Sequence, residues 1–446
     1  MTISDDIFHA YDIRGTADQL NEALARRVGV AVVIMTKAKR VVVGRDMRKT
    51  SPAFAKAVIE GITSMGADAV DIGMCTTPMF NFSVFAFKEH EAGVMVTASH
   101  NPAQYNGFKF SRGDASPISG KEIKPFILNE QTLSSGTQLG NVSSFDVAEP
   151  YIERLLEVSA MPSLKGMKVV IDAGNGMAGV ILPKLFARLD AEFFTLYFEP
   201  DGTFPNHEAN PVKTETLSDV KAMVLGESAD LGAALDGDAD RIGFVDEKGI
   251  DVSGGQCLAM LAEERLKSNP GAAVVWSPNA SWAVRDAIAQ SGGRSVWEKV
   301  GRTNIITRMQ AEQAMVGGEV SGHYFYPEFG YLESTEFTLL TVLKLIAQRK
   351  QPISKILEPY RTYVASGEIN FTVNDKAKVL SALETTYRPQ AKDVNTLDGF
   401  RFEFADWWFN VRQSNTEPLI RLSLEATSQK LMEEKRDEVT KFIQAQ

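Results

Sequence analysis

A short β-branched run, followed by a polar loop and an amphipathic helix, opens three separate regions of this chain. The three stretches are RVVVGRDMRKTSPAFAKAVIEGI from Arg40, KVVIDAGNGMAGVILPKLFARL from Lys168 and AAVVWSPNASWAVRDAIAQSGG from Ala272. In the first, Ser51 is a plausible helix cap, Pro52 suits the first turn, and apolar residues then recur at helical spacing. Strands that lead directly into helices are typical of α/β folds. The pattern therefore predicts three similar α/β domains.

The C-terminal part of the chain has a different pattern. The stretches SGEINFTVND and FRFEFADWWFNVRQSNTEPLIRLSLEA alternate as antiparallel strands do, and TSQKLMEEKRDEVTKFIQ predicts a closing helix. A smaller α+β domain is expected here. The predicted fold class is thus α/β, with three α/β domains of mixed sheets and a C-terminal α+β domain. We place the four domains at residues 1–145, 146–254, 255–365 and 366–446.

Composition limits the environment and the partners of the chain. A net charge of −10 disfavours a nucleic-acid or acidic-membrane partner, although local basic pockets remain possible. No apolar run is long enough to span a membrane, and the acidic N-terminus MTISDDIFHAYD lacks the apolar core of a signal peptide. With Cys75 and Cys257 as the only cysteines, neither a disulfide scaffold nor a cysteine-built zinc site is expected. We expect a cytoplasmic monomer or weak homo-oligomer.

The acidic motif LDGDADRIGFVDEKG places Asp236, Asp238 and Asp240 at alternate positions. Three carboxylates so close together repel one another, and a hard cation such as Mg²⁺ relieves that repulsion. The flanking segments resemble strands, which favours a metal-binding connection over a solvated acidic turn. An EF-hand is disfavoured because Arg241 stands where its loop needs glycine, although Glu247 falls at its twelfth position.

The stretch TASHNP ends an apolar strand and places Ser99 beside His100. Ser99 could simply cap the following turn. A hydrolase nucleophile is disfavoured because no Gly-x-Ser-x-Gly elbow surrounds it. A phosphorylated Ser99 would carry a charge of about −1.5 to −2 and would need a nearby cation, which the acidic motif could hold. Further along, Lys109 could carry a proton or merely balance charge.

Two further loops have the side chains that a sugar phosphate requires. GGEVSGHYF combines Glu319, Ser321 and His323 with three glycines, and Glu319 and Ser321 could hold sugar hydroxyls. A lone histidine is more often structural than catalytic, but the neighbouring carboxylate favours function. RQSNTEP, which begins at Arg412, offers a guanidinium, hydroxyls and an amide that suit one phosphate group.

These four motifs, in this order, resemble those of the α-D-phosphohexomutase superfamily, and more closely its phosphomannomutase/phosphoglucomutase branch. The resemblance extends from YDIRG (Tyr11–Gly15) to RQSNTEP. It implies that a phosphoserine of the first domain faces Mg²⁺ of the second, while the third domain supplies a sugar-binding loop and the fourth a phosphate-binding loop. All four would line one central cleft.

The resemblance also implies a role for each matching residue. The expected catalytic residues are Ser99, His100, Lys109, Arg14, Arg241 and His323. The expected metal ligands are Ser99, through its phosphate, and Asp236, Asp238 and Asp240. The expected sugar-binding residues are Glu319, Ser321, Lys299 and Arg302, and the expected phosphate-binding residues are Arg412, Ser414, Asn415, Thr416 and Arg421. Arg302 is a departure, since many relatives carry histidine after Lys-Val-Gly; FGYLES is another, since relatives often have an Asp-Gly stretch there.

The implied activity is that of an isomerase that interconverts hexose 6-phosphate and hexose 1-phosphate, with mannose, glucose or both as the sugar. One Mg²⁺ per chain and a hexose 1,6-bisphosphate intermediate are expected, and the product would feed nucleotide-sugar and polysaccharide synthesis. Two alternatives use the same residues. One is a metal-dependent sugar-phosphate phosphatase, and the other is a non-catalytic sugar-phosphate-binding protein.

Overall fold

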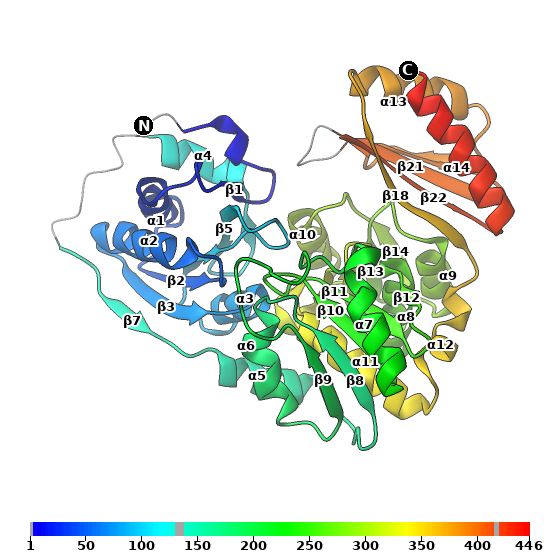
Figure 1. Cartoon of the computed structure of the whole chain (residues 1–446). Helices are drawn as coiled ribbons and strands as arrows, with labels where there is room; N and C mark the ends of the chain where they lie inside the picture. The colour runs from blue at the N-terminus through cyan, green and yellow to red at the C-terminus, as the bar shows by residue number, and fades with distance from the viewer. Residues whose placement is uncertain (1–2, 130–137, 414–418) are drawn as a thin grey trace. The chain divides into compact units, whose positions relative to one another are not determined.

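The computed structural model describes residues 3–129, 138–413 and 419–446. The chain forms two compact units (Figure 1). Unit 1 contains the residues up to 252 together with residues 321–356, and unit 2 contains residues 253–320 together with residues 357–446. Each unit therefore consists of two separate parts of the chain.

The first sheet of unit 1 is mixed. Its strands are β1 (Ile13–Thr16), β2 (Arg40–Arg45), β3 (Asp68–Met74), β4 (Ala92–Val96), β5 (Tyr105–Arg112), β6 (Pro117–Ile118) and β7 (Val142–Ser144). Their order is β1-β5-β4-β2-β3-β7, with β6 beside β5. The strands β2, β3, β4 and β7 are parallel, whereas β5 is antiparallel to its neighbours β4 and β1.

Helices cover both faces of this sheet. The helices are α1 (Glu22–Thr36), α2 (Ser51–Ser64), α3 (Thr77–Ala86) and α4 (Gly120–Leu128). Val43 and Val94 point into the core that α1, α2 and α4 share. On the other face, a Cβ on Gly93 would lie within 2.8 Å of both Phe80 and Val84 of α3. The predicted α/β layering is confirmed for this domain.

The predicted helix cap at Ser51 is wrong. Thr50 precedes the helix without capping it through its side chain, and Ser51 is the first helical residue. The Ser51 hydroxyl instead donates a hydrogen bond of 2.5 Å to buried Asp46. The Ser51 hydroxyl therefore binds the Asp46 carboxylate and does not cap the helix.

The second sheet of unit 1 carries the acidic motif. Its strands are β8 (Lys168–Asp172), β9 (Glu192–Leu196), β10 (Leu231–Leu235), β11 (Ile242–Asp246) and β12 (Asp251–Val252), in the order β12-β11-β10-β8-β9. Its helices are α5 (Ala148–Ser159), α6 (Ala178–Phe186) and α7 (Ser218–Glu227). The antiparallel partners Leu235 and Ile242 bracket the acidic turn. The predicted strands on either side of the turn are confirmed, and the helices that an EF-hand requires are absent from these positions.

The remaining described strands and α-helices of unit 1 are β16 (Tyr324–Tyr326), β17 (Leu332–Glu333), α11 (Thr335–Arg349) and α12 (Ile353–Ile356). In unit 2, the strands β13 (Ala273–Trp276), β14 (Arg294–Trp297) and β15 (Val316–Gly318) are parallel and are accompanied by α8 (Gly254–Lys267), α9 (Trp282–Gln290) and α10 (Arg302–Glu312).

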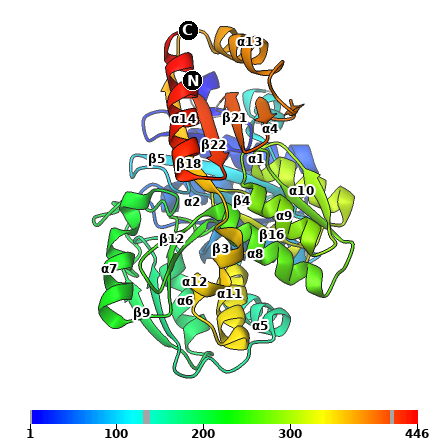
Figure 2. The same ribbon diagram turned by 90° about the vertical axis from the view of Figure 1, so that its right-hand side faces the viewer.

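The C-terminal sheet of unit 2 is entirely antiparallel, as predicted. Its strands are β18 (Val364–Thr372), β19 (Asp393–Asn395), β20 (Phe400–Glu403), β21 (Trp407–Gln413) and β22 (Leu419–Ala426), in the order β18-β22-β21-β20-β19. Its helices are α13 (Lys376–Tyr387) and α14 (Gln429–Gln444). Figure 2 shows α14 against β18 and β22.

Within unit 2, a buried cation links this sheet to the loop before α9. Arg401 of β20 is fully buried and donates hydrogen bonds to the carbonyl oxygens of Pro278 (2.5 Å) and Ala280 (2.8 Å). Glu403 pairs with it at 2.6 Å, and its guanidinium lies 3.6 Å from the centre of the Trp408 ring. Burial lowers the pKa of Arg401 to about 10, so the side chain is still charged at neutral pH.

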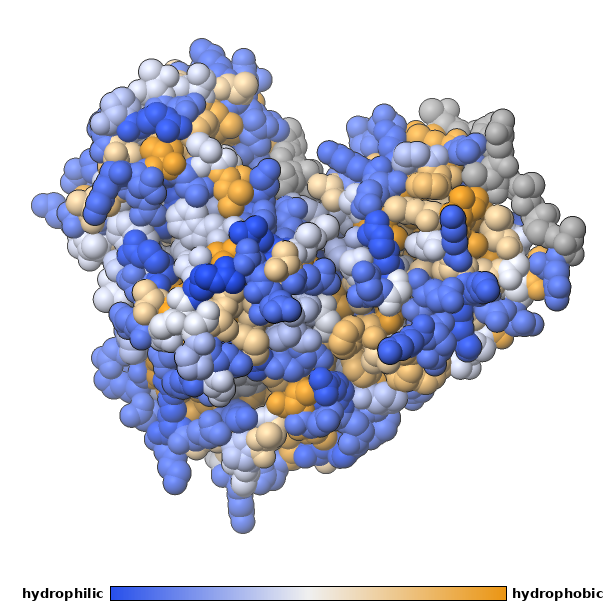
Figure 3. Space-filling view, turned by 180° about the vertical axis from the view of Figure 1, so that it is seen from behind, coloured by the Kyte–Doolittle hydropathy of each residue, from blue (hydrophilic) through white to orange (hydrophobic). Residues whose placement is uncertain are grey.

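The hydropathy of the exposed surface agrees with the amino-acid composition of the chain. Figure 3 shows a face on which hydrophilic side chains predominate, with small groups of apolar side chains between them. Among the described residues, no helix combines the length and the apolar character needed to cross a membrane.

Two glycines allow α1 and α2 to pack with their backbones in contact. A Cβ on Gly29 of α1 would lie 2.1 Å from the carbonyl oxygen of Val58, and a Cβ on Gly61 of α2 would lie 2.1 Å from that of Arg26. Real Cβ atoms do not approach backbone oxygens so closely, so any larger side chain forces the two helices apart.

We predict that Gly61→Ala lowers the free energy of unfolding by about 1–3 kcal/mol, because the added methyl group overpacks the crossing of the helices. Gly226→Ala is the matched control, since a Cβ on this exposed helical glycine meets nothing within 4 Å. The control should be neutral or should stabilise the protein by up to about 1 kcal/mol. Urea unfolding of both variants measures the difference, and equal effects would contradict the prediction.

Candidate active site

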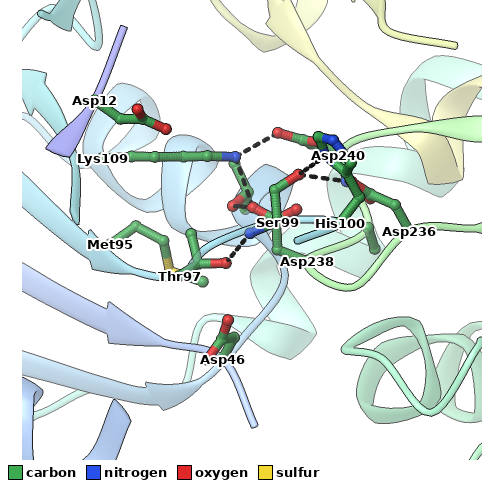
Figure 4. Close-up of polar contacts among 12 residues, drawn as sticks. Asp12, Asp46, Met95, Thr97, Ser99, His100, Lys109, Asp236, Asp238 and Asp240 are labelled. Carbon is green, nitrogen blue, oxygen red and sulfur yellow. Dashed lines mark hydrogen bonds and ion pairs between the residues drawn. The ribbon is translucent and has the colours of Figure 1, made fainter. Parts of the chain in front are cut away.

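Ser99 and the acidic turn lie in direct contact, although 137 positions separate Ser99 from Asp236. The Ser99 hydroxyl donates a hydrogen bond of 2.8 Å to Asp236 Oδ2 (Figure 4). Both side chains are buried. Ser99 follows β4 and Asp236 follows β10, so the ends of two strands in different sheets of unit 1 form this contact.

The backbone at Ser99 adopts a conformation that non-glycine residues seldom adopt. Its φ is +51°, in the left-handed region. The Ser99 N–H donates to Thr97 Oγ1 at 2.9 Å. Such a conformation costs free energy and persists only where the surrounding structure holds it.

Buried Arg48 provides that support. Its guanidinium donates to the carbonyl oxygens of Ser99 (2.8 Å), Asn101 (2.6 Å), Pro102 (2.8 Å) and Tyr105 (3.0 Å). Its Nε also donates to Asp46 at 3.1 Å, within a buried ion pair. One arginine thus fixes the whole turn that carries Ser99. Sequence reasoning missed Arg48, although it lies in the loop that follows the predicted strand at Arg40.

The three aspartates form a buried group of oxygens. One carboxylate oxygen from each of Asp236, Asp238 and Asp240 lies within 4.8 Å of the others. Asp238 Oδ1 is buried and has no hydrogen-bond partner in the part of the chain that the structure describes. Burial, together with the two neighbouring carboxylates, raises the pKa of Asp236 well above its usual value. An all-oxygen donor set with an unsatisfied buried oxygen and mutual repulsion fits a hard divalent cation such as Mg²⁺.

Lys109 reaches the same group from β5. Its Nζ lies 2.6 Å from Asp238 Oδ2 and 2.5 Å from Asp240 Oδ2. Burial alone would raise the pKa of Asp240, but the Lys109 ammonium and His323 outweigh it and lower that pKa well below its usual value. These contacts agree with the charge-balancing role of Lys109; the alternative role as a proton carrier stays a prediction.

The remaining expected catalytic residues of unit 1 surround Ser99 and the acidic turn. His100 Nδ1 lies 3.3 Å from Ser99 Oγ, and burial together with the cations Arg241 and Arg14 lowers the pKa of His100 well below its usual value. Arg14 donates to Asn101 Oδ1 at 2.8 Å. His100 is therefore a neutral imidazole beside the serine.

His323 joins this group through its two ring nitrogens. Its Nε2 lies 3.4 Å from Arg241 Nε and 3.4 Å from Asp240 Oδ1. Its Nδ1 lies 2.9 Å from the Ser321 hydroxyl. Ser321 thus lies beside His323 and Arg241, two of the expected catalytic residues. Glu319, its expected partner in sugar binding, belongs to unit 2, so their pairing stays a prediction.

Unit 2 holds the other expected substrate-binding residues. Buried Glu319 accepts a hydrogen bond of 2.6 Å from the N–H of Gly301, in the loop that carries Lys299 and leads into α10 at Arg302. Sequence reasoning missed Asp398, which accepts from the N–H of Val300 at 3.2 Å. Two carboxylates, Glu319 and Asp398, therefore hold the loop that carries Lys299.

The two expected phosphate-binding arginines are bound to one carboxylate. Glu368 of β18 pairs with Arg412 at 3.2 Å and with Arg421 at 2.8 Å. Since Glu368 already bridges the two guanidinium groups, they lie close enough to share one anion. The other expected phosphate ligands, Ser414, Asn415 and Thr416, lie outside the described residues.

A segment of the second domain packs against Arg48. The Arg48 guanidinium lies 5.1 Å from the centre of the Phe204 ring. Further along this segment, His207 Nε2 lies 2.8 Å from buried Asp172 at the end of β8. The hydrogen bond to Asp172 raises the pKa of His207 to about 9. A protonated His207 therefore anchors the segment whose Phe204 ring packs against Arg48, the residue that holds the turn carrying Ser99.

Comparison with known proteins assigns the chain to one family. Successive parts of the chain match the domains described as "Phosphoglucomutase/phosphomannomutase": the alpha/beta/alpha domains I (5–132), II (149–249) and III (253–363), and the C-terminal domain (368–442). The chain belongs to the phosphoglucomutase/phosphomannomutase family, and it is therefore an isomerase that acts by phosphoryl transfer.

Individual relatives cover nearly the whole chain. A phosphomannomutase of Salmonella typhimurium is 37% identical over 434 residues, which are 94% of each chain. A phosphomannomutase/phosphoglucomutase of Pseudomonas aeruginosa is 34% identical over 442 residues, which are 97% of this chain and 94% of the relative. A crystal structure of a family member from Burkholderia thailandensis has a TM-score of 0.90 at 32% identity and covers 100% of this chain and 98% of its own. The predicted family and fold class are thereby confirmed.

We predict that His207→Gln destabilises the protein at pH 6 by about 1–2 kcal/mol, a value reduced because the ring is partly exposed. Since the folded-state pKa of His207 is raised from 6.5 to about 9, the contribution is fully present below pH 6.5 and is lost as the pH rises through about 9. Urea unfolding of both proteins between pH 6 and pH 10 measures it. A difference that stays constant across this range would contradict the prediction.

Proposed function

We propose that this enzyme interconverts hexose 6-phosphate and hexose 1-phosphate of both mannose and glucose, through a phosphorylated Ser99 and a hexose 1,6-bisphosphate intermediate. The observation that carries the proposal is the hydrogen bond between the buried Ser99 hydroxyl and the buried acidic turn. A phosphate on Ser99 would stand directly beside three carboxylates, which is stable only if a divalent cation lies between them.

The transfer itself is an in-line exchange of one oxygen for another on phosphorus. The free sugar hydroxyl forms a bond to the phosphorus of phosphoserine while the bond to Ser99 Oγ breaks, and the hydroxyl proton passes to a base. When bound by Asp236, Asp238 and Asp240, Mg²⁺ would supply positive charge that offsets the charge of the transferring group. In the second half, the other phosphate of the bisphosphate returns to Ser99 by the same exchange.

Residues of unit 1 have the charges that this exchange requires. His100 is neutral and adjacent to Ser99 Oγ, so it can accept a proton there. Arg14 and Lys109 can offset negative charge beside the leaving oxygen. The turn fixed by Arg48 would keep Ser99 Oγ in one position throughout both halves of the reaction.

The substrate must bind in two orientations, because its two phosphorylated oxygens are far apart. Arg412 and Arg421 would hold whichever phosphate is not reacting, since a guanidinium pair recognises the phosphate and little of the sugar. Glu319 and Ser321 would hold the O3 and O4 hydroxyl groups of the sugar, which look alike in both orientations. We place the four domains at residues 1–145, 146–254, 255–365 and 366–446. We further propose that the enzyme is cytoplasmic and that its product feeds nucleotide-sugar and polysaccharide synthesis.

Ser99→Ala tests the covalent intermediate. We predict that the variant loses turnover of hexose phosphates by at least about 10³-fold, because no phosphoryl group can be stored on the enzyme. Intact-mass measurement of the wild type after incubation with glucose 1,6-bisphosphate should show one added phosphate, and peptide mapping should place it on Ser99. The alanine variant should stay unmodified.

Each alternative function has its own signature in this experiment. Release of inorganic phosphate in place of isomerised product would indicate a phosphatase. Binding of sugar phosphate without turnover by the wild type would indicate a non-catalytic binding protein. Full activity of Ser99→Ala would refute the phosphoserine mechanism.

Substrate range gives a separate prediction. Mannose and glucose differ only at C2, outside the hydroxyls that Glu319 and Ser321 are proposed to hold, so both 1-phosphates should be converted to 6-phosphates. Coupled assays with each sugar phosphate measure the two values of kcat/KM. Turnover of mannose 1-phosphate with no detectable turnover of glucose 1-phosphate would contradict the prediction.

A further inference from the structure

Thr77, the first residue of α3, holds the middle aspartate of the acidic turn. Its hydroxyl donates a hydrogen bond of 2.6 Å to Asp238 Oδ2, and its backbone N–H donates to the Asp238 carbonyl oxygen at 2.9 Å. Both residues are fully buried. Neither residue can therefore exchange this bond for one to water.

Thr335, the first residue of α11, holds the next position of the same turn. Its hydroxyl donates to the carbonyl oxygen of Ala239 at 2.7 Å. Ala239 has a φ of +58°, so the turn has left-handed backbone between two of the proposed metal ligands. The first residues of α3 and α11, which lie far apart in the sequence, thus bind consecutive residues of the turn.

A buried carboxylate joins these two helix starts. Glu336 is fully buried and accepts hydrogen bonds from Thr76 (3.3 Å), Thr335 (3.2 Å) and Tyr151 (2.8 Å). The Tyr151 hydroxyl also lies 2.8 Å from that of Ser334. The threonines are therefore parts of one packed network, and their hydroxyl groups have little freedom to turn away from the acidic turn.

The aspartates of the turn differ in how each is oriented. Asp236 Oδ1 is fixed by the N–H groups of Asp240 and Arg241, within the turn itself. Asp238 receives no such bond from the turn; Thr77 and Lys109 both bind its Oδ2, and its buried Oδ1 has no hydrogen-bond partner among the described residues. A donor fixed on one oxygen of a carboxylate directs the other oxygen, as in the outer shells of metal sites.

We propose that Thr77 and Thr335 are positioning residues for the divalent cation: Thr77 directs Asp238 Oδ1 toward the cation, and Thr335 fixes the backbone between the ligands. This inference rests on the proposed function, because it assumes that the acidic turn holds Mg²⁺. Neither threonine contacts the sugar phosphate in this scheme. Their loss should change metal affinity and kcat at limiting metal, while KM for hexose phosphate at saturating metal stays the same.

Thr77→Val tests the proposal, because valine has nearly the shape of threonine and keeps the backbone N–H bond to Asp238. We expect the affinity of the purified full-length enzyme for Mn²⁺, followed by electron paramagnetic resonance, to fall about tenfold or more. Mg²⁺ titration calorimetry should show the same loss. Thr77→Ser keeps the hydroxyl and should restore the affinity. Thr335→Val should weaken binding independently.

Thr341→Val is the matched control. Thr341 lies in the same helix as Thr335, and its buried hydroxyl donates to the carbonyl oxygen of Phe337 at 2.8 Å, within the helix itself. This variant should bind Mn²⁺ as the wild type does. Melting temperatures of all variants without metal separate a loss of folding from a loss of affinity, and Thr335→Val carries the test if Thr77→Val does not fold.

The outcomes distinguish this inference from the proposed function. Wild-type affinity in both Thr77→Val and Thr335→Val would overturn the inference while leaving the metal site in place. If Asp238→Asn binds Mn²⁺ as tightly as the wild type, the acidic turn is not the metal site and the inference falls with it. Turnover of hexose phosphates by the wild type, measured separately, reports on the mutase function in every case.

Discussion

The burial of three carboxylates beside one serine hydroxyl is the constraint on which the rest of unit 1 depends. Asp236, Asp238 and Asp240 are almost completely removed from water, and this burial, together with the repulsion from the other two carboxylates, raises the pKa of Asp236. Charges in such a place must be compensated by other charges or by hydrogen bonds. Lys109, the N–H groups of the turn and the Thr77 hydroxyl provide part of that compensation. A divalent cation would provide the remainder.

A buried arginine holds a loop through its carbonyl oxygens in each unit. Arg48 binds the carbonyl oxygens of the turn that carries Ser99, and Arg401 binds those of the loop before α9. A guanidinium can satisfy several carbonyl groups at once, because its donors lie in a fixed planar fork. The buried ion pairs with Asp46 and Glu403 keep each arginine charged and oriented. Rigid loops of this kind reduce the reorganisation that phosphoryl transfer would otherwise require.

Much of the fold could be predicted from local patterns, because consecutive residues encode both the strand–loop–helix openings and the alternating strands. The strands on either side of the acidic turn and the antiparallel C-terminal sheet were predicted in this way and are confirmed. The cap at Ser51 was not predicted correctly, since its hydroxyl is taken by Asp46, a tertiary partner. Thr77, Thr335 and Glu368 gave no signal at all, because single threonines and glutamates are common everywhere in a sequence.

The amino-acid sequence is sufficient to identify the chemical groups: a serine after a buried strand, three alternating carboxylates, and arginines near the C-terminus. Residue types and their spacing suffice to identify these groups, because the side chains carry the reactive atoms. Only the tertiary structure decided that Ser99 touches Asp236, that Lys109 spans two of the carboxylates, and that one glutamate binds both Arg412 and Arg421. These contacts join residues far apart in the chain, and only the packing of sheets and helices determines which of them meet.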